Sequence, residues 1–133
     1  ADHFIIDGAT TREQIEAFVE SVRALKEEEP PILIFSAVSD KKYEQMIEYL
    51  CRHLQTKAFV VTEIEDKRRV PAGELGEIFK RYARCPVYVK ADVKDAVACA
   101  DEMRTKETYI YCIGSLYLAE MVEKALQEVE TSC

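Results

Sequence analysis

The chain has 133 residues, of which 48% are hydrophobic and 32% are charged. This balance predicts one soluble globular domain spanning residues 1–133, and no apolar run approaches the roughly 20 residues that a membrane-spanning helix needs. The formal net charge of −7 argues against general binding to nucleic acid or to anionic membranes, because both are negatively charged. A nucleotide is not excluded, since backbone N–H groups at helix starts can hold phosphates.

The first apolar run, residues 4–6, precedes a helix expected to begin near Thr11. The inward face of that helix has a 3.6-residue period and consists of Ile15, Phe18, Val19, Val22 and Leu25. A second apolar run, 32–35, precedes a helix with an unbroken stripe formed by Tyr43, Met46, Ile47, Leu50, Cys51 and Leu54. A third run, 58–61, leads through a polar loop to Pro71, which suits the first turn of another helix.

The alternation continues to the end of the chain. A short run at 86–89 predicts a strand near the sheet edge, and Asp92 is expected to cap the helix after it. The run 109–113 predicts a fifth strand, and the last helix is expected to point Leu118, Val122, Ala125 and Val129 inward. Continuous apolar strands separated by helices indicate a mostly parallel sheet. We therefore predict a three-layer, Rossmann-like α/β domain with about five strands and helices on both faces.

Five cysteines and two histidines are the residues that could suggest zinc. No two cysteines have C-x-x-C spacing, and neither His3 nor His53 stands in a ligand-like spacing to a cysteine, so the sequence predicts no metal site. An odd cysteine count without a basic-then-apolar leader favours the cytoplasm. The chain starts without Met almost directly before a strand, which predicts further sequence upstream.

Small, hydroxyl and carboxylate residues follow the predicted strands, at the sheet edge where such folds bind ligands. Asp7 precedes Gly8 and either contacts a ligand, such as a ribose or a metal, or ties its own loop. Thr10 and Glu13 form a possible capping box. Further candidates follow the second and fifth strands, and they are Ser36, Ser39, Asp40, Lys41, Gly114, Ser115 and Tyr117.

Several of these candidates also have a purely structural interpretation. Asp40 is expected to cap the following helix. Lys41 is more informative, because a cation in the first turn of a helix is unfavourable unless an anion compensates it. Ser115 is interpreted first as a helix cap and second as an anion site. The basic run 67–69 is expected to be a solvated loop that could meet a phosphate or another domain.

No P-loop, G-x-G-x-x-G turn or G-x-S-x-G nucleophile motif is present. Three other stretches carry a resemblance. They are 4–9 (FIIDGA), 34–43 (IFSAVSDKKY) and 114–118 (GSLYL). In this order they resemble the C-terminal domain of folylpolyglutamate synthase and dihydrofolate synthase, within the Mur ligase superfamily. The loop 68–71 is similar to the family's linker into the third helix.

The resemblance implies an ATP- and Mg²⁺-dependent ligase that activates a folate or pteroate carboxylate as an acyl phosphate, which glutamate then attacks. It implies that the P-loop and most metal ligands lie in an N-terminal ATPase domain of the same polypeptide, so this fragment alone is expected to be inactive. Asp7 would contact ATP, and Asp40, Lys41 and the turn at Gly114 and Ser115 would lie near the interdomain cleft. The side chains of Thr10 and Thr11 would also border this cleft and face the reacting end of the nucleotide.

The chain departs from the family pattern at four positions. Thr10, Thr11 and Arg12 replace the family's His, Asn and Pro, and Ser36 replaces a Gly. A hydroxyl can replace a hydrogen bond but not an imidazole, so the roles of the His and Asn are not carried over, and no catalytic residue is assigned. Two alternatives stay open: a catalytically degenerate ligase-like binding module, and a stand-alone α/β interaction domain.

Overall fold

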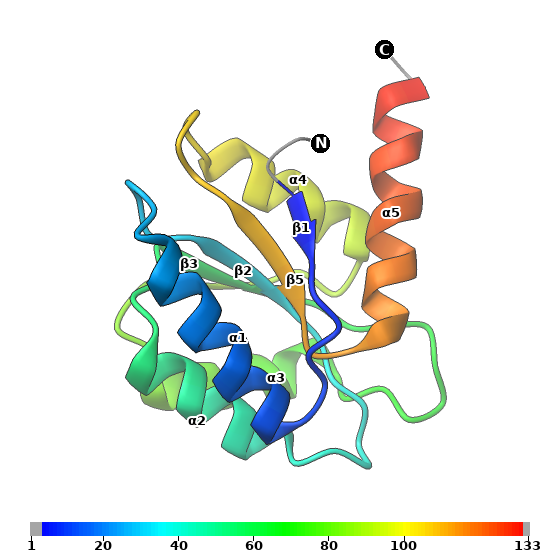
Figure 1. Cartoon of the computed structure of the whole chain (residues 1–133). Helices are drawn as coiled ribbons and strands as arrows, with labels where there is room; N and C mark the ends of the chain where they lie inside the picture. Colours follow the sequence, from blue (N-terminus) through cyan, green and yellow to red (C-terminus); the bar gives the residue numbers. More distant parts are fainter. Residues whose placement is uncertain (1–3, 132–133) are drawn as a thin grey trace.

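The computed structural model describes residues 4–131, with side chains described for residues 4–128. Strands and helices alternate throughout this range (Figure 1). The strands are β1 (Phe4–Ile6), β2 (Ile32–Phe35), β3 (Ala58–Val61), β4 (Val87–Val89) and β5 (Ile110–Ile113). The helices are α1 (Arg12–Leu25), α2 (Tyr43–His53), α3 (Ala72–Tyr82), α4 (Val93–Met103) and α5 (Leu116–Thr131).

The strands form one parallel sheet in the order β1-β5-β2-β3-β4. Every residue of β2, β3 and β5 is buried, whereas β1 and β4 lie at the edges and are partly exposed. The predicted parallel sheet and the edge position of the fourth strand are therefore confirmed. Burial on both faces explains why the central strands are apolar at every position.

Helices cover both faces of the sheet, so the predicted three-layer fold is also confirmed (Figure 1). Helices α1, α2 and α3 pack on the face that carries Leu33, Phe35, Phe59, Val61 and Ile113. Helices α4 and α5 pack on the opposite face, which carries Ile32, Ile34, Val60, Ile110 and Cys112. The period-2 alternation of strand side chains thus divides the apolar residues into two cores. Within the described part of the chain, no helix is long and apolar enough to span a membrane.

Most predicted helix faces are buried as expected, and Cys112 lies in the core. The prediction for Leu25 was wrong, because this side chain is 63% exposed. Leu25 is the last residue of α1, and the next residue, Lys26, has a left-handed backbone conformation (φ 50°). The helix therefore ends at Leu25, and this side chain does not pack against the sheet. Pro71 lies at the N-cap of α3, one residue before the first turn. The inward prediction for Val129 lies outside the described side chains.

Candidate functional site

The face of the sheet on which the following helix packs changes at β5. The connections after β1 and β2 lead to α1 and α2 on one face, whereas the connection after β5 leads to α5 on the other face. Since β5 lies between β1 and β2, neighbouring chains diverge at the carboxyl ends of these three strands. This is the topological switch point, where open α/β sheets bind ligands. It brings together the segments 7–11, 36–42 and 114–117.

Backbone contacts hold these segments close together. The Gly114 N–H donates to the Ala9 carbonyl at 3.0 Å, and the Ser36 N–H donates to the Ile113 carbonyl at 3.4 Å. Gly114 has a φ of +102°, and an added Cβ would press into the Ser36 carbonyl oxygen and lie 2.9 Å from the Phe35 ring. Only glycine therefore fits at the centre of this edge.

Asp7 lies at the end of β1, and its carboxylate organises the turn that follows. Its Oδ1 accepts the Ala9 N–H at 2.9 Å, so the loop-tying interpretation is confirmed. The ligand interpretation stays a prediction. At Gly8, an added Cβ would make only an ordinary contact of 3.5 Å with Leu116 Cδ2. Packing within the chain therefore does not require glycine here, although glycine would allow a ligand to approach the backbone closely.

The start of α1 differs from the predicted capping box by one residue. Thr11, not Thr10, is the N-cap, and its Oγ1 accepts the Gln14 N–H at 3.2 Å. Gln14 Oε1 in turn accepts the Thr10 N–H at 2.8 Å. The sequence contains two overlapping boxes, Thr10 with Glu13 and Thr11 with Gln14. The extended backbone of Thr11 (φ −125°, ψ 164°) selects the second.

The predicted capping role of Asp40 and the predicted position of Lys41 in the first turn of a helix were both wrong. Helix α2 begins at Tyr43 with Lys42 at its N-cap, and no side chain caps it. Asp40 instead forms an ion pair with Arg68, with 3.2 Å between Oδ2 and Nη1. Lys41 precedes the N-cap, so it is not in the first helical turn, and the argument from an unfavourable helix charge does not apply. A further turn between β2 and α2, closed by the Lys41 N–H and the Val38 carbonyl at 3.2 Å, delays the helix.

Arg68 is the residue of this edge that sequence reasoning missed. Its guanidinium contacts Asp40, Asp66 and the Tyr117 hydroxyl, at 3.2, 3.2 and 2.9 Å. Ser39 joins the same group through its N–H, which donates to the Arg68 carbonyl at 2.6 Å. The basic run 67–69 was the available signal, but charge in a loop does not predict partners that lie 28 and 49 residues away.

Two serines at the switch point differ in whether their hydroxyl groups have a hydrogen-bond partner. Ser115 Oγ accepts the Tyr117 N–H at 3.2 Å, so its predicted capping role at the start of α5 is confirmed. Ser36 is fully buried, and its Oγ has no hydrogen-bond partner among the described residues. Leaving a buried hydroxyl unpaired is unfavourable. Ser36 therefore stands where packing alone would favour a smaller or apolar side chain.

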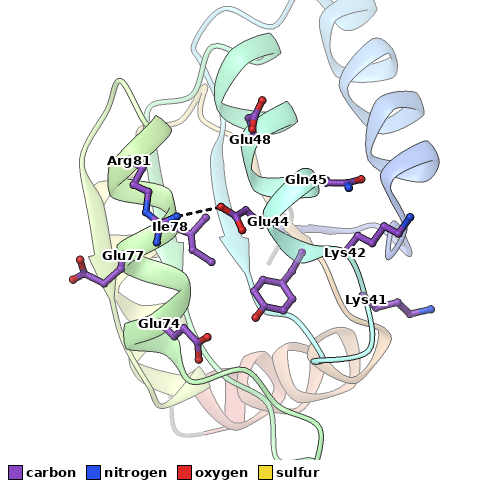
Figure 2. Close-up of a pocket in the computed structure, with 10 residues that line it drawn as sticks. Lys41, Lys42, Glu44, Gln45, Glu48, Glu74, Glu77, Ile78 and Arg81 are labelled. Atoms are coloured by element: carbon purple, nitrogen blue, oxygen red, sulfur yellow. Dashed lines mark hydrogen bonds and ion pairs between the residues drawn. The ribbon is translucent and has the colours of Figure 1, made fainter.

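The two surface grooves described below do not contain the predicted site residues as a set. A groove of about 570 Å³ lies between α2 and α3, and Arg81 pairs with Glu44 across it at 3.1 Å (Figure 2). Of the candidates, only Lys41 lines this groove. A second groove of about 840 Å³ is bordered by segments 63–69, 91–94 and α5, and it contains none of them. The switch-point geometry is the stronger indicator, because both grooves are open, charged surfaces.

The described residues contain no group of three or more His, Cys, Asp or Glu side chains that could hold a metal ion. A divalent metal at this edge would therefore need ligands from a bound nucleotide or from other parts of the protein. The same edge also carries the Asp7 carboxylate, the backbone at Gly8 and the Leu116 side chain, which is 62% exposed.

The fold and the switch-point edge define a three-layer α/β domain with a parallel sheet. Residues 2–116 match the family model described as "Mur ligase, glutamate ligase domain". Because the match covers most of the 133 residues, the chain belongs to this family. No curated protein matches the chain.

Several solved structures with a similar fold are folate-related ligases. E. coli FolC in complex with DHPP and ADP has a TM-score of 0.84 and 16% identity over 96% of this chain. Folylpolyglutamate synthase of Mycobacterium tuberculosis, complexed with ADP and AMPPCP, has a TM-score of 0.77 and 18% identity over 92%. The bifunctional synthase of Yersinia pestis, complexed with AMPPNP and Mn ion, has values of 0.78 and 18% over 93%. The alignments cover 28–29% of those longer chains, and at these identities they show the fold.

Proposed function

We propose that this chain is the C-terminal domain of an ATP-dependent ligase that adds glutamate to folate or dihydropteroate through an acyl phosphate. The observation that carries the proposal is the glutamate-ligase family match over residues 2–116. Its first and last segments, 4–9 and 114–116, meet at the switch point through the Gly114 to Ala9 hydrogen bond. The segments that resemble the folate ligases are thus also the segments that the fold brings together.

In this proposal, an N-terminal ATPase domain of the same polypeptide supplies the P-loop and most Mg²⁺ ligands, and this domain closes over the nucleotide from the other side. ATP is the phosphoryl donor, and Mg²⁺ neutralises its phosphates during transfer. Asp7 accepts a hydrogen bond from the nucleotide, while Gly8 lets the backbone approach it. The candidates at 36–41 and 114–117 border the cleft. The protein acts in the cytoplasm, where folate and ATP are available.

The net charge of −7 is compatible with this division of work. A domain that had to bind triphosphate alone would need cations, because phosphate recognition relies on them and on helix N-termini. If the other domain provides those cations, this domain can remain acidic. The isolated 133-residue chain is therefore expected to release no phosphate from ATP.

A degenerate module that binds a ligand without turnover is the second candidate, and the start of α1 favours it. Thr10 and Thr11 stand where the family has His and Asn, and both are engaged with Gln14. Thr11 Oγ1 already accepts a backbone N–H, and Thr10 Oγ1 lies 3.3 Å from Gln14 Oε1. Neither hydroxyl replaces the chemistry of an imidazole.

The test is phosphate release by the full-length polypeptide, given ATP, Mg²⁺, glutamate and either dihydropteroate or a reduced folate. We expect turnover with one of these acceptors, and we expect Asp7→Ala to reduce it by about 10- to 100-fold, as the loss of a charged contact to the nucleotide would. Asp95→Ala provides a matched control, because Asp95 is an exposed carboxylate on α4, away from the switch point.

The outcomes separate the two candidates. Turnover that falls in Asp7→Ala and not in Asp95→Ala supports the ligase. Binding of ATP or folate without phosphate release supports the degenerate module. If the full-length protein neither binds nor turns over these compounds, both proposals fail.

A further inference from the structure

Two loops at the carboxyl edge are joined by backbone pairing. Val38 and Arg69 form an isolated antiparallel bridge. On either side of it, the Ser39 N–H donates to the Arg68 carbonyl at 2.6 Å and the Val70 N–H donates to the Ala37 carbonyl at 3.1 Å. The loop after β2 and the loop after β3 therefore form one paired unit, and Arg68 lies next to the bridge.

The Arg68 side chain extends this unit to a third segment. Its Nε bonds Asp66 within the same loop, its Nη1 bonds Asp40 in the loop after β2, and its Nη2 donates to the Tyr117 hydroxyl. The guanidinium carbon also lies 5.6 Å from the centroid of the Tyr117 ring. Each nitrogen of the planar group thus has a different partner, an arrangement that the point charge of a lysine cannot reproduce.

These partners stand on opposite sides of the switch point. Asp40 leads into α2, which covers one face of the sheet, whereas Tyr117 belongs to the first turn of α5, which covers the other. Arg68 therefore links the two sides across the carboxyl ends of β2 and β5. The start of α5 also carries Ser115 and Leu116, and Leu116 contacts the region of Gly8.

Charge and exposure argue against a role for Arg68 as a direct anion ligand. Its single positive charge already faces two carboxylates, so the cluster with Asp40 and Asp66 carries a net negative charge. About half of the side chain, 45%, is exposed, and solvent screens such ion pairs, so they contribute little to global stability. This arrangement can instead define the geometry between the segments that it joins.

We propose that Arg68 is a positioning residue, which fixes the loop after β2 and the start of α5 relative to each other so that the nucleotide edge is preorganised. The last part of this statement rests on the ligase function proposed above. Because both loops contribute candidates for the cleft, a displacement of about 1 Å between them would reduce turnover strongly.

The first experiment does not depend on ligase activity. Amide hydrogen exchange is measured in the full-length protein for segments 37–42 and 115–119, in Arg68→Gln, Arg68→Lys and Tyr117→Phe. Arg81→Gln is the matched control, since Arg81 is an exposed arginine that joins α2 and α3 through Glu44. We expect Arg68→Gln to accelerate exchange at least about threefold in both segments, with no loss of protection in the central strands.

The second experiment uses steady-state kinetics of the same variants. Arg68→Gln is expected to lower kcat/KM for ATP about tenfold or more, and Arg68→Lys nearly as much, because a lysine keeps the charge but not the three-way geometry. Tyr117→Phe should give a smaller loss, and the double variant with Arg68→Gln should be no worse than Arg68→Gln alone. Arg81→Gln should match the wild type in both measurements.

Unchanged exchange of both segments in Arg68→Gln would overturn the proposal, as would full rescue of either measurement by Arg68→Lys. If the wild type shows no turnover while exchange rises as expected, the ligase function fails and the positioning role of Arg68 stands.

Discussion

At the amino ends of the strands, Glu29, Lys57, Thr105 and Thr108 contact one another in a polar network, whereas the carboxyl ends carry the loops that meet at the switch point. Thr108 is fully buried and donates to Glu29 at 3.0 Å, and Lys57 lies 3.8 Å from the same carboxylate. The Tyr111 hydroxyl similarly donates to Glu27, and burial together with this carboxylate raises the pKa of Tyr111. These contacts join the loops of this edge, although Glu27 Oε2 is buried without a hydrogen-bond partner among the described residues.

The carboxyl edge departs from good local packing at three positions. Ser36 is buried without a partner, Gly8 has space for a side chain that it lacks, and Leu116 is exposed. Natural sequences depart from good local packing mainly where function requires it. We therefore expect structural contacts at the amino edge, and under the proposed function we expect ligand contact at the carboxyl edge. Three experiments on stability can break or sharpen this contrast.

The largest expected effect is at Gly114. Its φ of +102° and the nearby Ser36 carbonyl leave no space for a Cβ, so Gly114→Ala should lower the free energy of unfolding by about 3 kcal/mol or more. Gly73→Ala is the control, because nothing lies within 4 Å of its added Cβ in the first turn of α3. That change should stabilise the chain by about 0.5–1 kcal/mol. Urea unfolding measures both, and a Gly114→Ala chain as stable as the wild type would contradict the packing described for the switch point.

A smaller effect is expected at Ser36. Removing its unpaired hydroxyl in Ser36→Ala should raise the free energy of unfolding by up to about 1 kcal/mol. Thr62 is the matched control, since it is equally buried at a neighbouring strand end but donates to the Ala91 carbonyl at 3.2 Å. Thr62→Val should lower stability by about 1 kcal/mol. The same chemical unfolding assay decides the sign, and a loss of stability in Ser36→Ala would show that Ser36 is structural.

The smallest effect is a pH dependence at the amino edge. Hydrogen bonds from Thr105 and Thr108, followed by the charge of Lys57, hold the pKa of Glu29 below its ordinary value of 4.5. A lowered folded-state pKa stabilises the fold above pH 4.5, and this contribution disappears as the pH falls through the folded value. Glu29→Gln should therefore flatten the fall in stability between about pH 5 and pH 3, measured by urea unfolding at each pH.

Asp66 supplies the comparison at the carboxyl edge. Hydrogen bonds from the Arg68 backbone and side chain lower the pKa of Asp66 in the same direction. Asp66→Asn should also flatten the acid dependence, but it should additionally loosen the Arg68 contacts, whereas Glu29→Gln should leave ligand binding unchanged. If Glu29→Gln impaired nucleotide binding as much as Asp66→Asn, the separation of the two edges would be wrong.

Patterns along the chain were sufficient for the sheet, the order of elements and most helix faces. Continuous apolar runs such as 32–35 and 58–61 identify buried parallel strands, because only burial on both faces tolerates four apolar residues in succession. The 3.6-residue period of α1 and α2 likewise reports which side faces the sheet. The turn at Gly114 and Ser115 was also recognisable from the sequence, because a glycine and a hydroxyl residue after an apolar strand favour a tight turn and a helix cap.

The sequence did not determine the residue at which each helix begins after a loop, or which charged side chains form pairs. The choice of Thr11 over Thr10 as the N-cap of α1 depended on two competing capping boxes, and the start of α2 at Tyr43 depended on an additional turn; such alternatives differ by little free energy. Two partners of Arg68, Asp40 and Tyr117, lie 28 and 49 residues away in the sequence, and no local pattern encodes their approach. Periodicity thus determined the layers and the strands of this protein. The tertiary structure alone decided how its loops meet at the switch point, because contacts between distant loops depend on the packed sheet beneath them.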